Sequence, residues 1–122
     1  MTVLEAITEL DNIKPNNYSQ AQKIRWLSRL DGRITAEIIN AHEGGDGAAF
    51  AGYDEVATGA VLLAPAPYDD LYLRWLEAQI DFANNEYAKY NNSAAAFNAA
   101  YAEFAGHYHR SHTPKGTRLQ FF

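Results

Sequence analysis

The sequence predicts a small, mainly all-α protein. We expect a bundle of about four helices, a long irregular loop or short β-hairpin between the second and third, and an extended C-terminal tail. Apolar residues recur at three- and four-residue spacing in four stretches, which is the period of an amphipathic helix. Capping patterns or helix breakers flank these stretches. The length of 122 residues fits one domain, so residues 1–122 are interpreted as a single unit.

The first helix is predicted to be short. Thr2 and Glu5 have the spacing of a capping box, in which each side chain bonds the other residue's backbone N–H. Pro15 disfavours helical backbone at the residue before it, so the helix is expected to end near Asn12. Its apolar stripe comprises Val3, Leu4, Ile7 and Leu10.

A second helix is predicted to begin after Ser19, which forms another potential capping box with Gln22. We expect it to run through Gly32, at a cost of about 1 kcal/mol relative to alanine, and to stop near Ala41. Its inward stripe is predicted to comprise Ile24, Leu27, Leu30 or Asp31, Ile34 and Ile38.

The third helix is predicted to follow the prolines of residues 65–67, with Asp69 and Asp70 at its positive end. Its stripe is read as continuing to Tyr87, with a break at Asn91-Asn92-Ser93 that caps a fourth helix. In that fourth helix the recurring apolar residues are Phe97, Ala100, Tyr101, Phe104 and Tyr108.

Two segments lack a helical pattern. Residues 42–64 are predicted to form a protruding loop, either irregular or containing one or two short strands. Loops of this length are uncommon unless they are functional or ordered by a partner. Residues 111–122 are predicted to form an extended tail, because Pro114 and Gly116 oppose a helix.

Composition restricts the function. The net charge of −5 argues against general nucleic-acid binding, and the lack of cysteine excludes a disulfide framework or a thiolate site. Residues 104–122 carry three basic residues and no acidic ones, so a basic tail follows an acidic body. Twelve of the sixteen aromatic residues follow residue 67, which is more than one small core needs. Some are therefore expected to face another chain.

No stretch is apolar enough for a membrane span, and the first residues lack a secretory-signal pattern, so we expect a cytoplasmic product that binds no membrane. The residues also give little sign of catalysis, so we expect no enzyme, cofactor or metal. The histidines of residues 107–112 are better explained as polar groups at a helix end, and the glycines of residues 44–47 as a turn. Arg25, Arg29 and Arg33 are interpreted as a solvated face or one that meets an acidic neighbour.

Several segments nevertheless form a familiar series. They are Asn17-Tyr18-Ser19, Lys23-Ile24-Arg25-Trp26-Leu27, Leu30-Asp31-Gly32-Arg33-Ile34, Pro65-Ala66-Pro67-Tyr68-Asp69, Tyr72 to Asp81, Glu86 to Ser93 and Phe97 to Tyr101. Across nearly the whole chain this series resembles the head–tail connector, or head-completion adaptor, family of tailed bacteriophages and prophages.

The resemblance implies a structural virion protein, made in the host bacterial cytoplasm and located at the capsid neck. It implies a homo-oligomeric ring of about twelve copies that joins the portal protein to a downstream neck or stopper protein. Phage DNA would pass through the channel without sequence-specific binding, and the acidic balance suits such passage. The alternative is a small helical protein-binding or regulatory module without catalysis.

In that family the long loop and the C-terminal segment commonly make the intersubunit and portal contacts. The resemblance therefore directs attention to residues 42–64 and 110–122. The partner-binding candidates in them are Phe50, Tyr53, Leu62, Leu63, Arg110, Lys115, Arg118, Leu119, Phe121 and Phe122.

Overall fold

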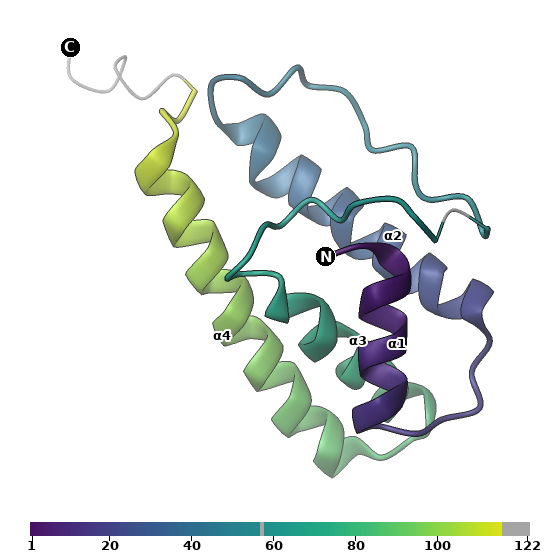
Figure 1. Cartoon of the computed structure of the whole chain (residues 1–122). Coiled ribbons are helices and arrows are strands. Elements are labelled where there is room, and N and C mark those ends of the chain that lie inside the picture. Colours follow the sequence, from purple (N-terminus) through teal and green to yellow (C-terminus); the bar gives the residue numbers. More distant parts are fainter. Residues whose placement is uncertain (57, 116–122) are drawn as a thin grey trace.

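The computed structural model describes residues 1–56 and 58–115. Its elements, in chain order, are α1 (Val3–Ile13), α2 (Gln20–Glu37), the 3₁₀ turn η1 (Ile39–Ala41), α3 (Asp70–Ala83) and α4 (Tyr87–Ser111). The four α-helices pack as a small bundle, with a long loop between η1 and α3 (Figure 1). The predicted all-α fold class is confirmed.

Helix α1 begins and ends close to where the sequence placed it. The Thr2 hydroxyl accepts a hydrogen bond from the Glu5 N–H, and the Glu5 carboxylate accepts one from the Thr2 N–H, so the capping box is confirmed. The helix lies alongside α3 in the same direction. The N-terminal amine is 3.8 Å from Asp69, and at the other end Lys14 Nζ is 2.7 Å from Asp81 Oδ1.

Helix α2 passes through Gly32, as predicted, but ends at Glu37 rather than near Ala41. The chain continues from there as the 3₁₀ turn η1, which ends at Ala41. The predicted end therefore matches the end of η1 and not the end of α2. At the other end the Ser19 hydroxyl accepts the Gln22 N–H, while the Gln22 side chain bonds Arg25 rather than completing a capping box.

The predicted break between the third and fourth helices was wrong. The chain turns at Asn84, Asn85 and Glu86, and α4 runs without interruption through Asn91–Ser93. Asn85 adopts a left-handed φ of 59°, and the Glu86 N–H donates to the Asp81 carbonyl across the turn. This is the Schellman arrangement, in which asparagine is one of the few residues that tolerate the left-handed position.

The core joins all four helices. The predicted stripes of α1 and α2 lie in it apart from Leu4, which is exposed, and both alternatives on α2, Leu30 and Asp31, are buried. Helix α4 packs along α3 and contributes Phe97 and Phe104. The fully buried side chains include Val3, Leu10, Ile24, Leu27, Leu30, Ile34, Leu71, Tyr72, Leu76 and Ile80.

The loop between η1 and α3 is irregular, so the hairpin alternative was wrong for the described residues. Its later part passes beside the start of α1, where Thr2 and Val61 form an isolated antiparallel bridge (Figure 1). Nowhere in residues 1–56 and 58–115 does a helix have both the length and the apolar character that crossing a bilayer requires.

Candidate interaction surfaces

A buried carboxylate, that of Asp31 in α2, anchors the long loop to the bundle at more than one place. Its Oδ1 accepts a hydrogen bond from the Tyr72 hydroxyl of α3 at 2.6 Å. Its Oδ2 accepts one from the Tyr53 hydroxyl and one from the Leu63 N–H, the latter at 3.1 Å. The Tyr72 hydroxyl in turn accepts the N–H of buried Ala64 at 2.7 Å. One polar network therefore holds the loop at two separate places, Tyr53 and the adjacent residues Leu63 and Ala64.

This network changes the proton affinity of its members. Burial raises the pKa of the Asp31 carboxyl above its usual range, although the bonds from Tyr53, Tyr72 and Leu63 act in the opposite direction. Burial, and then the neighbouring carboxylate, raises the pKa of both tyrosine hydroxyls. In the described part of the chain no basic side chain pairs with Asp31. The donors are thus neutral, and the tyrosines remain protonated.

Two of the predicted partner-binding residues, Phe50 and Tyr53, pack against the bundle. Their aromatic planes meet edge to face at 5.0 Å between centroids, and the Tyr53 N–H donates to the Ser28 hydroxyl at 2.8 Å. Phe50 lies over Gly32, where an added Cβ would meet its edge at 3.9 Å. Both side chains remain partly exposed, and Phe50 lines a hollow of about 490 Å³ between the loop and α2.

Two other predicted partner-binding residues, Leu62 and Leu63 at the end of the loop, differ in exposure. Leu62 is only 3% exposed and belongs to the core, so the surface contact expected of it is wrong for this conformation. The backbone alternates here, and Val61 and Leu63 on either side are 68% and 36% exposed. Val56 at the loop tip and Leu4 of α1 are also exposed. We call Leu4, Val56 and Val61 the loop patch.

The start of the C-terminal segment lies against η1 as a short extended strap. The Glu43 N–H donates to the Thr113 carbonyl at 2.7 Å, and the Lys115 N–H donates to the Ala41 carbonyl at 3.0 Å. His42 and Pro114 form an antiparallel bridge between these bonds. The extended course predicted for the tail is confirmed for these residues.

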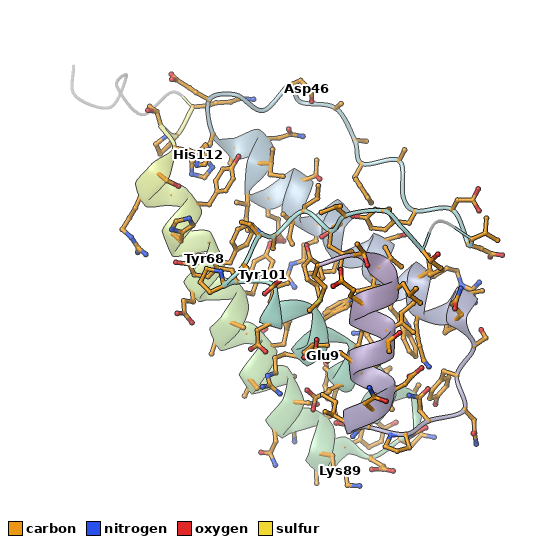
Figure 2. The ribbon with its side chains drawn as sticks, viewed as in Figure 1. Glu9, Asp46, Tyr68, Lys89, Tyr101 and His112 are labelled. Carbon is orange, nitrogen blue, oxygen red and sulfur yellow. The ribbon has the colours of Figure 1, made fainter. Side chains whose placement is uncertain are left out.

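A cluster of imidazoles lies under this strap. His42 Nδ1 is 2.6 Å from the Ile38 carbonyl, so that nitrogen carries the proton, and Nε2 faces His109 Nδ1 at 3.4 Å. His112, labelled in Figure 2, stacks on Tyr108 at 3.8 Å between centroids. Within residues 1–56 and 58–115 no three potential ligands are arranged to hold a metal ion.

The remaining tail candidates divide into two groups. Arg110 and Lys115 are exposed beside the imidazole cluster, and Arg110 lies in the last turn of α4, where positive charge favours the helix. Arg118, Leu119, Phe121 and Phe122 lie outside the described residues.

Most of the surplus aromatic side chains are used inside the chain. Trp26, Tyr72, Phe97 and Phe104 are buried, and several others pack at the edge of the core. Among the described residues only Phe82 and Tyr87 expose more than half of their area, at 55% and 56%. The sequence did not single out either residue as exposed, because Tyr87 was assigned to an apolar helix face.

The arginines of α2 are mostly engaged within the chain. Arg25 pairs with Glu55 at the loop tip, and Arg33 pairs with Glu37 one helical turn away. Arg33 also lies over the Tyr101 ring at 4.4 Å, which links α2 to α4. These contacts agree with the interpretation as a solvated face.

Comparison with protein-family models, curated proteins and solved structures found no match to this chain.

Proposed function

We propose that this chain is a structural adaptor of a tailed-phage virion. In this role it forms a ring at the capsid neck, between the portal protein and the next neck component, and DNA passes through the channel. The chain carries no chemistry in this role. The proposal rests first on the series of segments that resembles head–tail connectors and extends over nearly all of the sequence.

One structural observation supports it most directly. The long loop is built into the bundle through Asp31, so it holds a defined shape on an isolated subunit. A loop with so many internal attachments can present fixed contacts to a neighbour without first losing much conformational freedom. That property suits a subunit whose contacts must repeat around a ring.

The strap supports the same function at another side of the bundle. Its hydrogen bonds hold Thr113 and Lys115 against Glu43 and Ala41, so the segment with the predicted portal contacts starts from a fixed point. The loop patch lies beside the start of α1, whereas the strap lies at the end of α4 (Figure 1). A subunit of this form has separate surfaces for different partners.

The test is genetic complementation in the phage or prophage that encodes the chain. Without the gene, heads should be made but should fail to join tails, and electron microscopy should show separate heads and tails. Wild-type chain should restore joined particles, whereas a chain lacking residues 114–122 should keep its helical circular dichroism but fail to restore them. Normal tailed particles in the absence of the gene would overturn the proposal.

A further inference from the structure

Two imidazoles from distant parts of the chain face each other near the end of α4. His42 follows η1, His109 lies in the last turn of α4, and His42 Nε2 is 3.4 Å from His109 Nδ1. The two rings are inclined at 69°, with their centroids 5.6 Å apart. Because 67 positions separate the two residues, the spacing within residues 107–112 gives no sign of this pair.

The backbone fixes which nitrogen of His42 carries the proton. Its Nδ1 lies 2.6 Å from the Ile38 carbonyl, which can only accept a hydrogen bond, so the proton is on Nδ1. In the neutral ring, Nε2 then has a free electron pair on the side of His109. Histidines that bind metal ions usually donate their other ring N–H to a carbonyl or a carboxylate in this way. His42 therefore has the orientation and the tautomer of a metal ligand.

The separation of the two facing nitrogens matches that of two ligands on a tetrahedral zinc ion. Zinc binds histidine nitrogens at about 2.0–2.1 Å, so two of its ligands at the tetrahedral angle are about 3.4 Å apart. His42 Nε2 and His109 Nδ1 already have this separation. An octahedral ion with bonds of the same length needs neighbouring ligands about 2.9 Å apart, so the geometry favours zinc.

The pair is enclosed on one side and accessible on the other. His42 is only 7% exposed, whereas His109 is an exposed residue, so an ion can approach from solvent. His112 is held beside the helix, because its Nδ1 lies 3.1 Å from the Tyr108 carbonyl and its ring stacks on that of Tyr108. Among residues 1–56 and 58–115 no third ligand is arranged with the pair, which leaves two positions of a tetrahedral ion to water.

Charged side chains near the pair oppose a cation only weakly. Arg110 is in the same turn of α4, but its guanidinium turns back along the helix, where a Cβ added to Gly106 would meet it at 3.3 Å. Lys115 is exposed, so its charge is screened by water and salt. Glu43, directly after the buried imidazole in the chain, supplies a negative charge.

We propose that His42 Nε2 and His109 Nδ1 bind a zinc ion, with water in its other two positions. Binding replaces the hydrogen bond between the two nitrogens with two zinc–nitrogen bonds. His109 Nδ1 donates its proton to that hydrogen bond in the metal-free chain, and on zinc binding the proton moves to the other nitrogen of the same ring. The ion joins the end of η1 to the end of α4. One folded chain is enough to form the site, so it does not depend on the proposed function.

Isothermal titration calorimetry tests the site, with zinc chloride added to the purified full chain near neutral pH and without an added histidine tag. His42→Ala and His109→Ala each remove one ligand. His107→Ala is the matched control on α4, because its ring stacks on Tyr68 at 4.6 Å between centroids. His112→Ala distinguishes the pair from a site on α4 alone, which would join His109 to His112 one turn away. His109 is exposed, so its replacement should leave helical circular dichroism unchanged.

Wild type should bind one zinc ion per chain, with a dissociation constant below about 1 mM. Loss of a residue that only orients a ligand typically costs 10–100-fold in metal affinity, so loss of either ligand should cost at least about tenfold. His107→Ala and His112→Ala should stay within about twofold of wild type, a difference below about 0.4 kcal/mol. A wild-type chain that binds no zinc up to about 1 mM, or an unchanged affinity in His109→Ala, would overturn the site.

Nuclear magnetic resonance of the ring nitrogens locates the ion without any substitution, so it does not depend on whether His42→Ala keeps its strap. Zinc should shift the resonances of His42 Nε2 and His109 Nδ1 and leave those of His107 in place. Shifts at His109 and His112 without a shift at His42 would place the ion on α4 alone and overturn the proposed pair.

Discussion

Replacing Tyr72 with phenylalanine tests whether the buried Asp31 network holds the loop. The substitution removes one hydroxyl and leaves the ring, which is fully buried in α3, in place. The hydroxyl donates to Asp31 Oδ1 at 2.6 Å and accepts the Ala64 N–H at 2.7 Å. The variant therefore loses a bond to a carboxylate and leaves a buried backbone N–H without a partner.

The structure gives the magnitude of this loss. A hydrogen bond to a charged group contributes about 1.5–3 kcal/mol, and an unsatisfied buried donor costs about 1–3 kcal/mol. Since Asp31 keeps two other donors, we expect Tyr72→Phe to lower the free energy of unfolding by about 3 kcal/mol. Tyr53→Phe removes only one bond at a partly exposed site, so its expected loss is about 1.5 kcal/mol.

Urea unfolding followed by circular dichroism and tryptophan fluorescence measures both losses. Tyr101→Phe is the control, because the Tyr101 hydroxyl bonds Glu37 at an exposed position and its loss should cost under about 1 kcal/mol. The reasoning is refuted if Tyr72→Phe unfolds within about 0.5 kcal/mol of wild type, or if Tyr53→Phe is the more damaging of the two.

Three further predictions follow from particular residues. The raised pKa of Asp31 means that its contribution to stability is complete below the ordinary carboxyl pKa of about 4 and is lost as pH rises through the raised value. The difference in unfolding free energy between wild type and Asp31→Asn should therefore fall across that interval, and a flat difference would contradict the assignment. At the α3–α4 turn, Asn85→Val should lower the free energy of unfolding by about 1–2 kcal/mol, because valine does not tolerate the left-handed φ. Asn91→Ala, inside α4, should raise the melting temperature slightly. A larger loss of stability for Asn91→Ala than for Asn85→Val would indicate that the chain turns at residues 91–93 instead. His42→Ala should speed hydrogen exchange of the Glu43 and Lys115 amides by at least about tenfold. His107→Ala, which removes a ring stacked on Tyr68, should leave the exchange of those two amides unchanged. Equal effects of the two variants would show that the contacts of His42 do not hold the strap.

The helical part of the fold could be predicted because periodicity and capping are local properties. Thr2 and Ser19 start their helices through side chains only three residues away. The break after α3 was misplaced because two Asn-Asn pairs, at residues 84 and 91, have the same local propensity. Which pair becomes the turn depends on where α3 must reverse to pack against α4, and this is a tertiary property.

The surfaces were harder to predict. Exposure of Leu62 depends on which way the backbone alternates, and this is fixed by the Leu63 N–H bond to Asp31, 32 residues away. Leu30 and Asp31 were alternatives for one inward position of the second helix. Both are buried in the structure, because loop residues supply hydrogen-bond donors to the Asp31 carboxylate. The exposure of Phe82 and Tyr87 was not predicted, since aromatic residues at helical spacing are more often core.

Quantitative mass spectrometry of purified virions, with the portal protein as reference, gives the number of copies of this chain per particle. A ring at the neck predicts a fixed number, about twelve by resemblance to connectors. Virions that contain no copies, or a number that varies between preparations with the amount of cellular contamination, would contradict it.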